Sequence, residues 1–218
     1  MHPQPLFATA FAVCALVASS AHASPALLRS AEQGDLAGVQ HQLRSGAAVD
    51  PRDARQRTPL LLATWANHPA VAQALIAAGA DVNAKDDQQD SPYLVAGAHG
   101  RTEILKITLA HGADLRSTNR YGGTALIPAC ERGHVETVRT LIDAGVDVNH
   151  VNRLGWTGLL EAIILSDGGP RHQQIVQLLI NAKAAVNLPD KDGVTPLAHA
   201  RQRGYKSIEK ILSTAGVR

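Results

Sequence analysis

Short apolar stripes with helical spacing recur at a regular interval along this 218-residue chain. In one of them Val135, Val138, Leu141 and Ile142 follow the spacing of one face of an α-helix. Gly145 comes directly after this stripe, and glycine suits the left-handed backbone conformation that often ends a helix. A polar stretch then leads to the next apolar segment. The pattern predicts short amphipathic helices separated by glycine turns and polar loops.

Two sequence markers in one register show that these segments form a repeat. In the first marker Thr or Ser caps a helix, Pro fits its first turn and Leu begins its buried face. This marker occurs four times at intervals of 33 residues and once more after 38, at Thr58-Pro59-Leu60, Ser91-Pro92-Tyr93, Thr124-Ala125-Leu126, Thr157-Gly158-Leu159 and Thr195-Pro196-Leu197. The second marker ends the second helix of each unit, at Gly46, Gly79, Gly112, Gly145, Lys183 and Gly216. A repeat of this length with two helices per unit predicts a solenoid.

The repeat resembles the ankyrin repeat, with its Thr-Pro-Leu-His, Gly-His and Gly-Ala-Asp-Val-Asn elements, over nearly all of residues 25–218. Residues 79–83 match the last element outright. The resemblance implies an all-α ankyrin-repeat solenoid of about six helix-turn-helix units joined by β-hairpin-like loops, at approximately 25–57, 58–90, 91–123, 124–156, 157–194 and 195–218. The terminal units have the features of caps. Aliphatic packing is expected where the family has a histidine, at Leu61, Leu94, Ile127, Leu160 and Ala198.

The first 23 residues differ from the rest because they contain no Lys, Arg, Asp or Glu. An apolar run from Leu6 to Ala18 is followed by Ala21-His22-Ala23, the small-x-small form that signal peptidase cleaves. We expect a signal peptide over 1–23, cleavage after Ala23, and a periplasmic or secreted protein of residues 24–218 without a membrane anchor. The combination of a signal peptide with about six such units also resembles exported bacterial ankyrin-repeat proteins. The alternative is a buried N-terminal helix. The apolar run is too short for a comfortable membrane span.

Composition narrows the functional classes. The chain has 21 Lys+Arg against 19 Asp+Glu, so it lacks the basic field that attracts nucleic acid. Cys130 is the only cysteine after the signal segment, which leaves no intramolecular disulfide in the mature chain. The histidines show no metal-ligand spacing, and a glycine-rich phosphate loop is absent from the sequence. We expect a monomer with no metal, no cofactor, no nucleic-acid partner and no catalytic residues.

The resemblance implies that a partner protein binds at the hairpin tips and the solvent side of the first helices. Both tryptophans fall at these positions, and Trp, Tyr and Arg are the residues that most often anchor protein interfaces. We therefore expect the partner to contact Arg55, Arg57, Trp65, Arg120, Tyr121, Glu131, Arg132, Arg153, Leu154 and Trp156. The competing interpretation is that the tryptophans pack on neighbouring tips with arginine side chains stacked over them.

The fifth unit carries five additional residues between its helices, within 165–172. Such insertions map to loops and can form a binding face, but His172 aligns with His68 and His134, which favours a role as a turn histidine. The leading hypothesis is an exported, non-catalytic protein that binds another protein. The second is a structural or chaperone-like accessory subunit of a periplasmic enzyme complex. The third is an enzyme with its site in the 165–172 loop.

Overall fold

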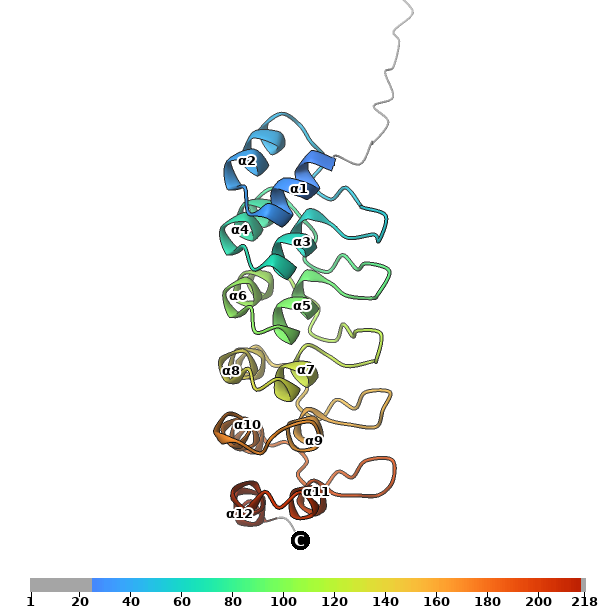
Figure 1. Ribbon diagram of the computed structural model, residues 1–218, viewed down its shortest axis with the longest axis vertical. Helices are drawn as coiled ribbons and strands as arrows, with labels where there is room; N and C mark the ends of the chain where they lie inside the picture. Colours follow the sequence, from blue (N-terminus) through green and yellow to red (C-terminus); the bar gives the residue numbers. More distant parts are fainter. Residues whose placement is uncertain (1–24, 217–218) are drawn as a thin grey trace, which may run out of the picture.

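The computed structural model describes residues 25–216 as a stack of helix pairs (Figure 1). The predicted signal peptide 1–23 and its cleavage site at Ala23 lie outside the described residues. The twelve helices of the described part are α1 (Pro25–Gln33), α2 (Leu36–Arg44), α3 (Pro59–Ala66), α4 (Pro69–Ala77), α5 (Pro92–Ala98), α6 (Thr102–Ala110), α7 (Leu126–Glu131), α8 (Val135–Asp143), α9 (Gly158–Ile164), α10 (Pro170–Asn181), α11 (Pro196–Gln202) and α12 (Lys206–Thr214). The predicted fold class, an all-α solenoid of about six helix-turn-helix units, is confirmed.

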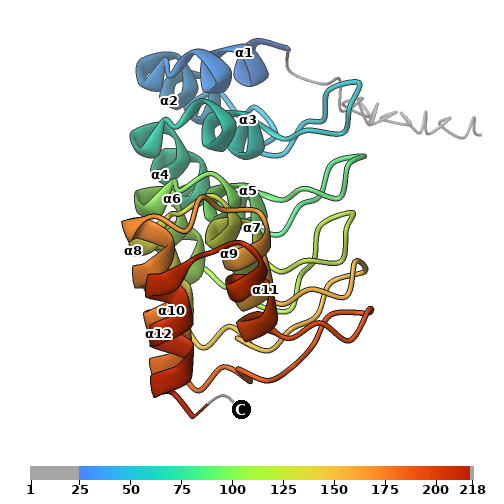
Figure 2. The ribbon, with the colours of Figure 1, turned by 60° about the horizontal axis from the view of Figure 1, so that its bottom comes forward.

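The odd-numbered helices form one column and the even-numbered helices a second column beside it (Figure 1). Loops project from the first column on the side away from the second, as the rotated view in Figure 2 also shows. Within residues 25–216 these loops contain no β-strand, although a backbone hydrogen bond closes each of them. None of the described helices combines the length and the apolar character that crossing a membrane requires.

The first helices begin at the predicted Thr and Ser residues in four units. The side chains of Thr58, Ser91, Thr157 and Thr195 each accept a hydrogen bond from the backbone N–H three residues later, at 3.2 or 3.3 Å. These bonds satisfy amide groups that have no partner inside the first turn of a helix.

Thr124 is the exception, and the prediction that its side chain caps a helix is wrong. Helix α7 begins at Leu126, and the buried Thr124 hydroxyl has no hydrogen-bond partner. In the unit before it, Val95 N–H donates to the carbonyl of the capping Ser91, but the equivalent residue here is Pro128, which has no N–H. Ile127 N–H donates to the free Thr124 carbonyl at 3.2 Å instead of to the hydroxyl.

Each loop is built around an Asp or Asn that sequence analysis did not single out. In the first complete loop Asp53 Oδ1 accepts the backbone N–H groups of Arg55 and Arg57, both at 2.9 Å. Residues at the equivalent position of the later loops make the same two bonds: Asp86, Asn119, Asn152 and Asp190. Short polar side chains of this kind hold a turn by bonding their own backbone, so the loop conformation is set locally in every unit.

Packing between neighbouring units forms a continuous core along the stack. Leu61, Leu94, Ile127 and Leu160 are buried, as expected for aliphatic side chains at the histidine position of the repeat.

The insertion in the fifth unit changes the second column only locally. Helix α10 has 12 residues where α8 has 9, so three of the five additional residues extend the helix.

We expect Leu141→Ala to destabilise the protein by about 2–5 kcal/mol, because it removes a fully buried side chain from the core of α8. Since each unit is stabilised by its neighbours, the units from α7 onward should unfold together. Urea denaturation followed by circular dichroism measures the effect. Leu154→Ala, which removes an exposed leucine, is the control and should stay within about 0.5 kcal/mol of wild type. Equal midpoints for the Leu141 variant and wild type would contradict the assigned register.

Candidate functional site

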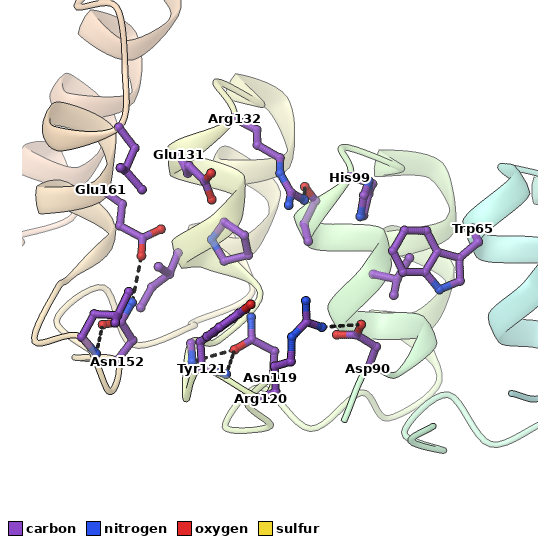
Figure 3. Close-up of a pocket in the computed structure, with 17 residues that line it drawn as sticks. Trp65, Asp90, His99, Asn119, Arg120, Tyr121, Glu131, Arg132, Asn152 and Glu161 are labelled. Atoms are coloured by element: carbon purple, nitrogen blue, oxygen red, sulfur yellow. Dashed lines mark hydrogen bonds and ion pairs between the residues drawn. The ribbon is translucent and has the colours of Figure 1, made fainter. Parts of the chain in front are cut away.

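A pocket of about 250 Å³ lies where the middle of the first-helix column meets the loops (Figure 3). Its walls come from α3, α5, α7 and α9 and from the loops that precede α5, α7 and α9. We call it the helix–loop pocket. Because the pocket spans four consecutive units, it is formed by the stacking of these units.

The helix–loop pocket gathers most of the large apolar side chains that the described surface exposes. Five such side chains are between 38% and 52% exposed: Trp65, Tyr121, Val151, Leu154 and Leu165. All except Val151 line this pocket. Apolar side chains scattered singly are ordinary on a protein surface, whereas a cluster in one hollow marks an interaction site.

Six residues of the predicted partner-binding set line the pocket, namely Trp65, Arg120, Tyr121, Glu131, Arg132 and Leu154. The other four, Arg55, Arg57, Arg153 and Trp156, do not. Arg57 is paired with Asp53 of its own loop at 2.7 Å, and Arg153 Nη1 donates to the Arg120 carbonyl at 3.0 Å. Trp156 is only partly exposed. The exposed Arg55 lies at the first loop, where its carbonyl accepts the Asp87 N–H. These contacts hold the loops together.

One end of the pocket is aromatic. The Trp65 indole and the His99 ring meet edge to face, with centroids 4.5 Å apart (Figure 3). Burial, together with the positive charges of Arg132 and Arg101, lowers the pKa of His99 to about 4. His99 is therefore neutral at pH 7 and adds no charge to this end, which we call the aromatic end.

At the loop side of the pocket the charge of Arg120 is shared between two neighbours. Its guanidinium lies 4.7 Å from the centre of the Tyr121 ring and 3.6 Å from Asp90. The ion pair holds the Arg120 guanidinium in position, and the cation–π contact holds the Tyr121 ring against it. Tyr121 is nevertheless about half exposed. Tyr121 is thus presented to solvent in a fixed position, which favours binding because little side-chain freedom is lost.

The opposite end of the pocket contains two carboxyl groups, Glu131 from α7 and Glu161 from α9 (Figure 3). Glu161 is only 5% exposed, and its Oε1 accepts a hydrogen bond from Asn152 Nδ2 at 2.8 Å. Burial, together with the negative charge of Glu131, raises the pKa of Glu161 to about 7. With Leu154 and Leu165, these two glutamates form what we call the acidic end.

Sequence analysis missed Glu161, although the repeat register contained the signal. The residue four positions after the capping residue is Leu62, Val95 or Pro128 in the preceding units, and a carboxyl stands there only in the fifth unit. A charged residue in an otherwise apolar register is rarely fully buried without a partner. In the last unit His199 occupies this position and binds Asp190 at 2.7 Å, as Glu161 binds Asn152.

The 165–172 insertion is held to its neighbours by several hydrogen bonds. His172 Nε2 lies 2.9 Å from the Glu131 carbonyl and Nδ1 lies 3.2 Å from Asp167. His68 contacts the Glu32 carbonyl in the same way, so His172 occupies the turn-histidine position that its alignment predicted. The Tyr205 hydroxyl donates to the Ser166 carbonyl at 2.5 Å. These contacts give the loop a packing role.

The remaining candidates for chemistry in residues 25–216 are the cysteine thiol and clusters of metal-binding side chains. Cys130 is fully buried, and burial raises the pKa of its thiol, so the reactive thiolate is disfavoured. Across residues 25–216 no three His, Cys, Asp or Glu side chains are grouped closely enough to hold a metal ion. The features of the helix–loop pocket are those of a binding surface.

Residues 27–119 and 93–168 match the protein family described as ankyrin repeats (three copies), and together they span more than half of the chain. The chain belongs to the ankyrin-repeat family. Ankyrin repeats are generally scaffolds for protein–protein interaction and typically non-catalytic binding domains. A protein partner is accordingly the class of ligand that this fold and this pocket indicate.

Several solved structures resemble the chain closely. It is 62% identical to an ankyrin repeat domain from Acinetobacter baumannii AYE, with a TM-score of 0.85, and the alignment covers 88% of this chain and 98% of that one. The ankyrin repeat protein EF0377 is 44% identical, with a TM-score of 0.83 over 86% of this chain and 96% of that one. The ankyrin repeat domain of Bcl-3, a member of the IκB family, is 28% identical, with a TM-score of 0.79 over 88% and 86% of the two chains.

A shorter segment resembles YahD, an ankyrin repeat protein of Escherichia coli strain K12. The two are 53% identical over 57 residues, which is 26% of this chain and 28% of YahD. The match thus spans less than a third of that relative. These similarities group the chain with bacterial ankyrin-repeat domains.

We expect Glu161→Gln to stabilise the protein at pH 8 by about 1–3 kcal/mol. The folded state raises the pKa of this carboxyl from its ordinary 4.5 to about 7, so its cost to stability grows between these pH values and is complete above the higher one. Below pH 4.5 the carboxyl is protonated in both states and the cost disappears. Glutamine retains an oxygen for Asn152 Nδ2.

Urea denaturation of the wild type and of the Glu161→Gln variant, at pH 8 and at pH 4, measures the difference in their free energies of unfolding. Glu136→Gln is the matched control, because Glu136 is an exposed residue of α8 outside the pocket. A stability gain for Glu161→Gln that is the same at both pH values would show that removal of the charge is not its cause.

Proposed function

We propose that this chain is an exported ankyrin-repeat protein that binds another protein through the helix–loop pocket and catalyses no reaction. The observation that carries the proposal is the gathering of four of the five large exposed apolar side chains in one pocket. Trp65 and Tyr121 add aromatic area there, and aromatic residues in pockets are the usual centres of binding energy in interfaces. The stack supplies a rigid surface across four units, as expected of a repeat protein that binds a partner.

The proposed surface differs from the residues expected from the sequence, because Arg55, Arg57, Arg153 and Trp156 lie outside the pocket. The pocket retains the tyrosine, leucine and first tryptophan of the predicted set and adds Leu165, while Arg57 and Arg153 make contacts within the loops. We therefore assign partner contact to the pocket and loop packing to these two arginines. An arginine that is already paired has less to offer a partner, since its existing bonds must be broken first.

Export rests on the character of residues 1–23. The segment combines an uncharged apolar run with a small-x-small site ending at Ala23.

We expect the protein recovered from its native organism to begin at Ser24, since signal peptidase cleaves after the small residue Ala23. Mass spectrometry of the N-terminal peptide, taken from separated periplasmic, secreted and cytoplasmic fractions, measures this. An Ala23→Arg variant should keep its leader. Recovery of the intact N-terminus in the cytoplasm alone would refute export.

We expect a partner protein to be captured from native extract by residues 24–218 and to be lost when the pocket is altered. Tyr121→Ala combined with Leu154→Ala should lower the captured amount by at least about tenfold, because both side chains line the pocket. Quantitative mass spectrometry of the captured proteins measures it.

Val151→Ala is the matched control, since Val151 is similarly exposed and lies outside the pocket. It should capture the partner as wild type does. Equal capture by the double variant and by the control would remove the pocket from the interface and move attention to the 165–172 loop.

A further inference from the structure

We infer that the acidic end of the helix–loop pocket receives a lysine or arginine side chain from an extended segment of the partner protein. This inference rests on the proposed function and specifies the chemistry of the bound partner. The acidic end consists of Glu131, Glu161, Leu154 and Leu165, and each of these residues lines the pocket.

Within the described part of the chain, no ion pair balances the negative charge of the acidic end, and the positive charge of Arg132 offsets only part of it at Glu161. Neither Glu131 nor Glu161 forms an ion pair with any Lys, Arg or His in residues 25–216. Asn152 supplies a hydrogen bond to Glu161 Oε1, and no described residue donates one to Oε2. A carboxyl as buried as Glu161 normally has a partner for its charge, so a site for a cation remains open.

The two guanidinium groups of the pocket make their ion pair and hydrogen bond away from the acidic end. Arg120 is paired with Asp90 and lies over the Tyr121 ring. Arg132 Nη1 donates to the Ala98 carbonyl at 2.6 Å, and the side chain points toward the aromatic end in Figure 3. The pocket is therefore polarised, with its arginine contacts toward α5 and its unpaired carboxyls at α7 and α9.

Two exposed leucines give the acidic end an apolar wall. Leu165 follows Glu161 by one helical turn, and its N–H donates to the Glu161 carbonyl at 3.1 Å. Leu154 follows Asn152 by two residues, and its N–H is bonded to Asn152 Oδ1 at 2.9 Å. Both exposed leucines are thus tied to the residues that hold the carboxyl. Lysine and arginine carry a methylene stem that packs on such apolar side chains while the charged head reaches a carboxylate.

These features favour a basic side chain over a free cation. A metal ion would need a third ligand, and the described residues provide no group of three. The leucines would not contribute to binding a small ion, whereas they match a methylene stem. The pocket crosses four first helices, so a peptide in extended conformation can place an apolar side chain at the aromatic end and its basic side chain at the acidic end.

The inference is tested with random 12-residue peptides displayed on phage and selected against residues 24–218. Peptides whose binding is abolished by Tyr121→Ala are taken as pocket binders. We expect one position of these peptides to be enriched in lysine or arginine. We also expect the Glu131→Gln, Glu161→Gln double variant to bind them at least about tenfold more weakly, the loss typical of a hydrogen bond to a charged group. Glu136→Gln, which removes an equal charge outside the pocket, should bind as wild type does.

A double-mutant cycle then assigns the contact. Replacing the enriched lysine by norleucine, or the arginine by citrulline, should weaken binding to wild type by a similar factor and leave binding to the double variant unchanged. Independent, multiplying effects would overturn the inference. So would pocket binders without an enriched basic residue, and that result would leave the proposed function standing. Selection that yields no peptide sensitive to Tyr121→Ala would overturn both.

Discussion

The structure depends on the need of each helix pair to bury its apolar face against the next pair, because a single unit has no interior of its own. The core therefore runs the whole length of the stack, and side chains such as Leu141 are fully buried only because neighbouring units are present. The same stacking fixes the spacing of the first helices and of the loops. A pocket with walls from α3, α5, α7 and α9 exists because four units hold one register.

Stacking also determines which positions are free to serve binding. Residues facing the neighbouring unit must be apolar and close-packed, whereas the loop tips and the exposed ends of the first helices are less restricted. Glu161 is informative because it lies between these classes. It is buried beside Glu131, burial raises its pKa to about 7, and the aliphatic residues Leu62 and Val95 occupy its position in earlier units. A carboxyl that lowers stability in a pocket-lining position is more readily explained by binding than by folding.

The fold could be predicted from the sequence because its determinants are local and repeated. Capping residues, turn glycines and apolar stripes each reappear in register, so the helices assigned in one unit can be verified in the next. The errors arose where a unit departs from the repeat. Thr124 does not cap α7 because Pro128, four residues later, lacks the N–H that engages the carbonyl in other units.

The pocket was harder to predict, since Arg57 and Arg153 occupy tip positions but bind Asp53 and the Arg120 carbonyl. Such pairings depend on loop conformation, which the tip positions alone do not specify.

Departures from the repeat are thus of two kinds. Some are compensated by other contacts in the structure, and others are not. Pro128 alters a helix start: the Ile127 N–H satisfies the Thr124 carbonyl within the same unit, while the buried Thr124 hydroxyl, which does not line the helix–loop pocket, keeps no hydrogen-bond partner in residues 25–216. The 165–172 insertion is absorbed by a longer α10 and by the bonds of His172 and Tyr205 to neighbouring carbonyls. Glu161 is compensated only in part, by Asn152, and its charge has no cationic partner among the described residues. An uncompensated departure next to exposed apolar side chains is where a partner would supply the missing contact, so the acidic end is the part of the stack best suited to recognise one.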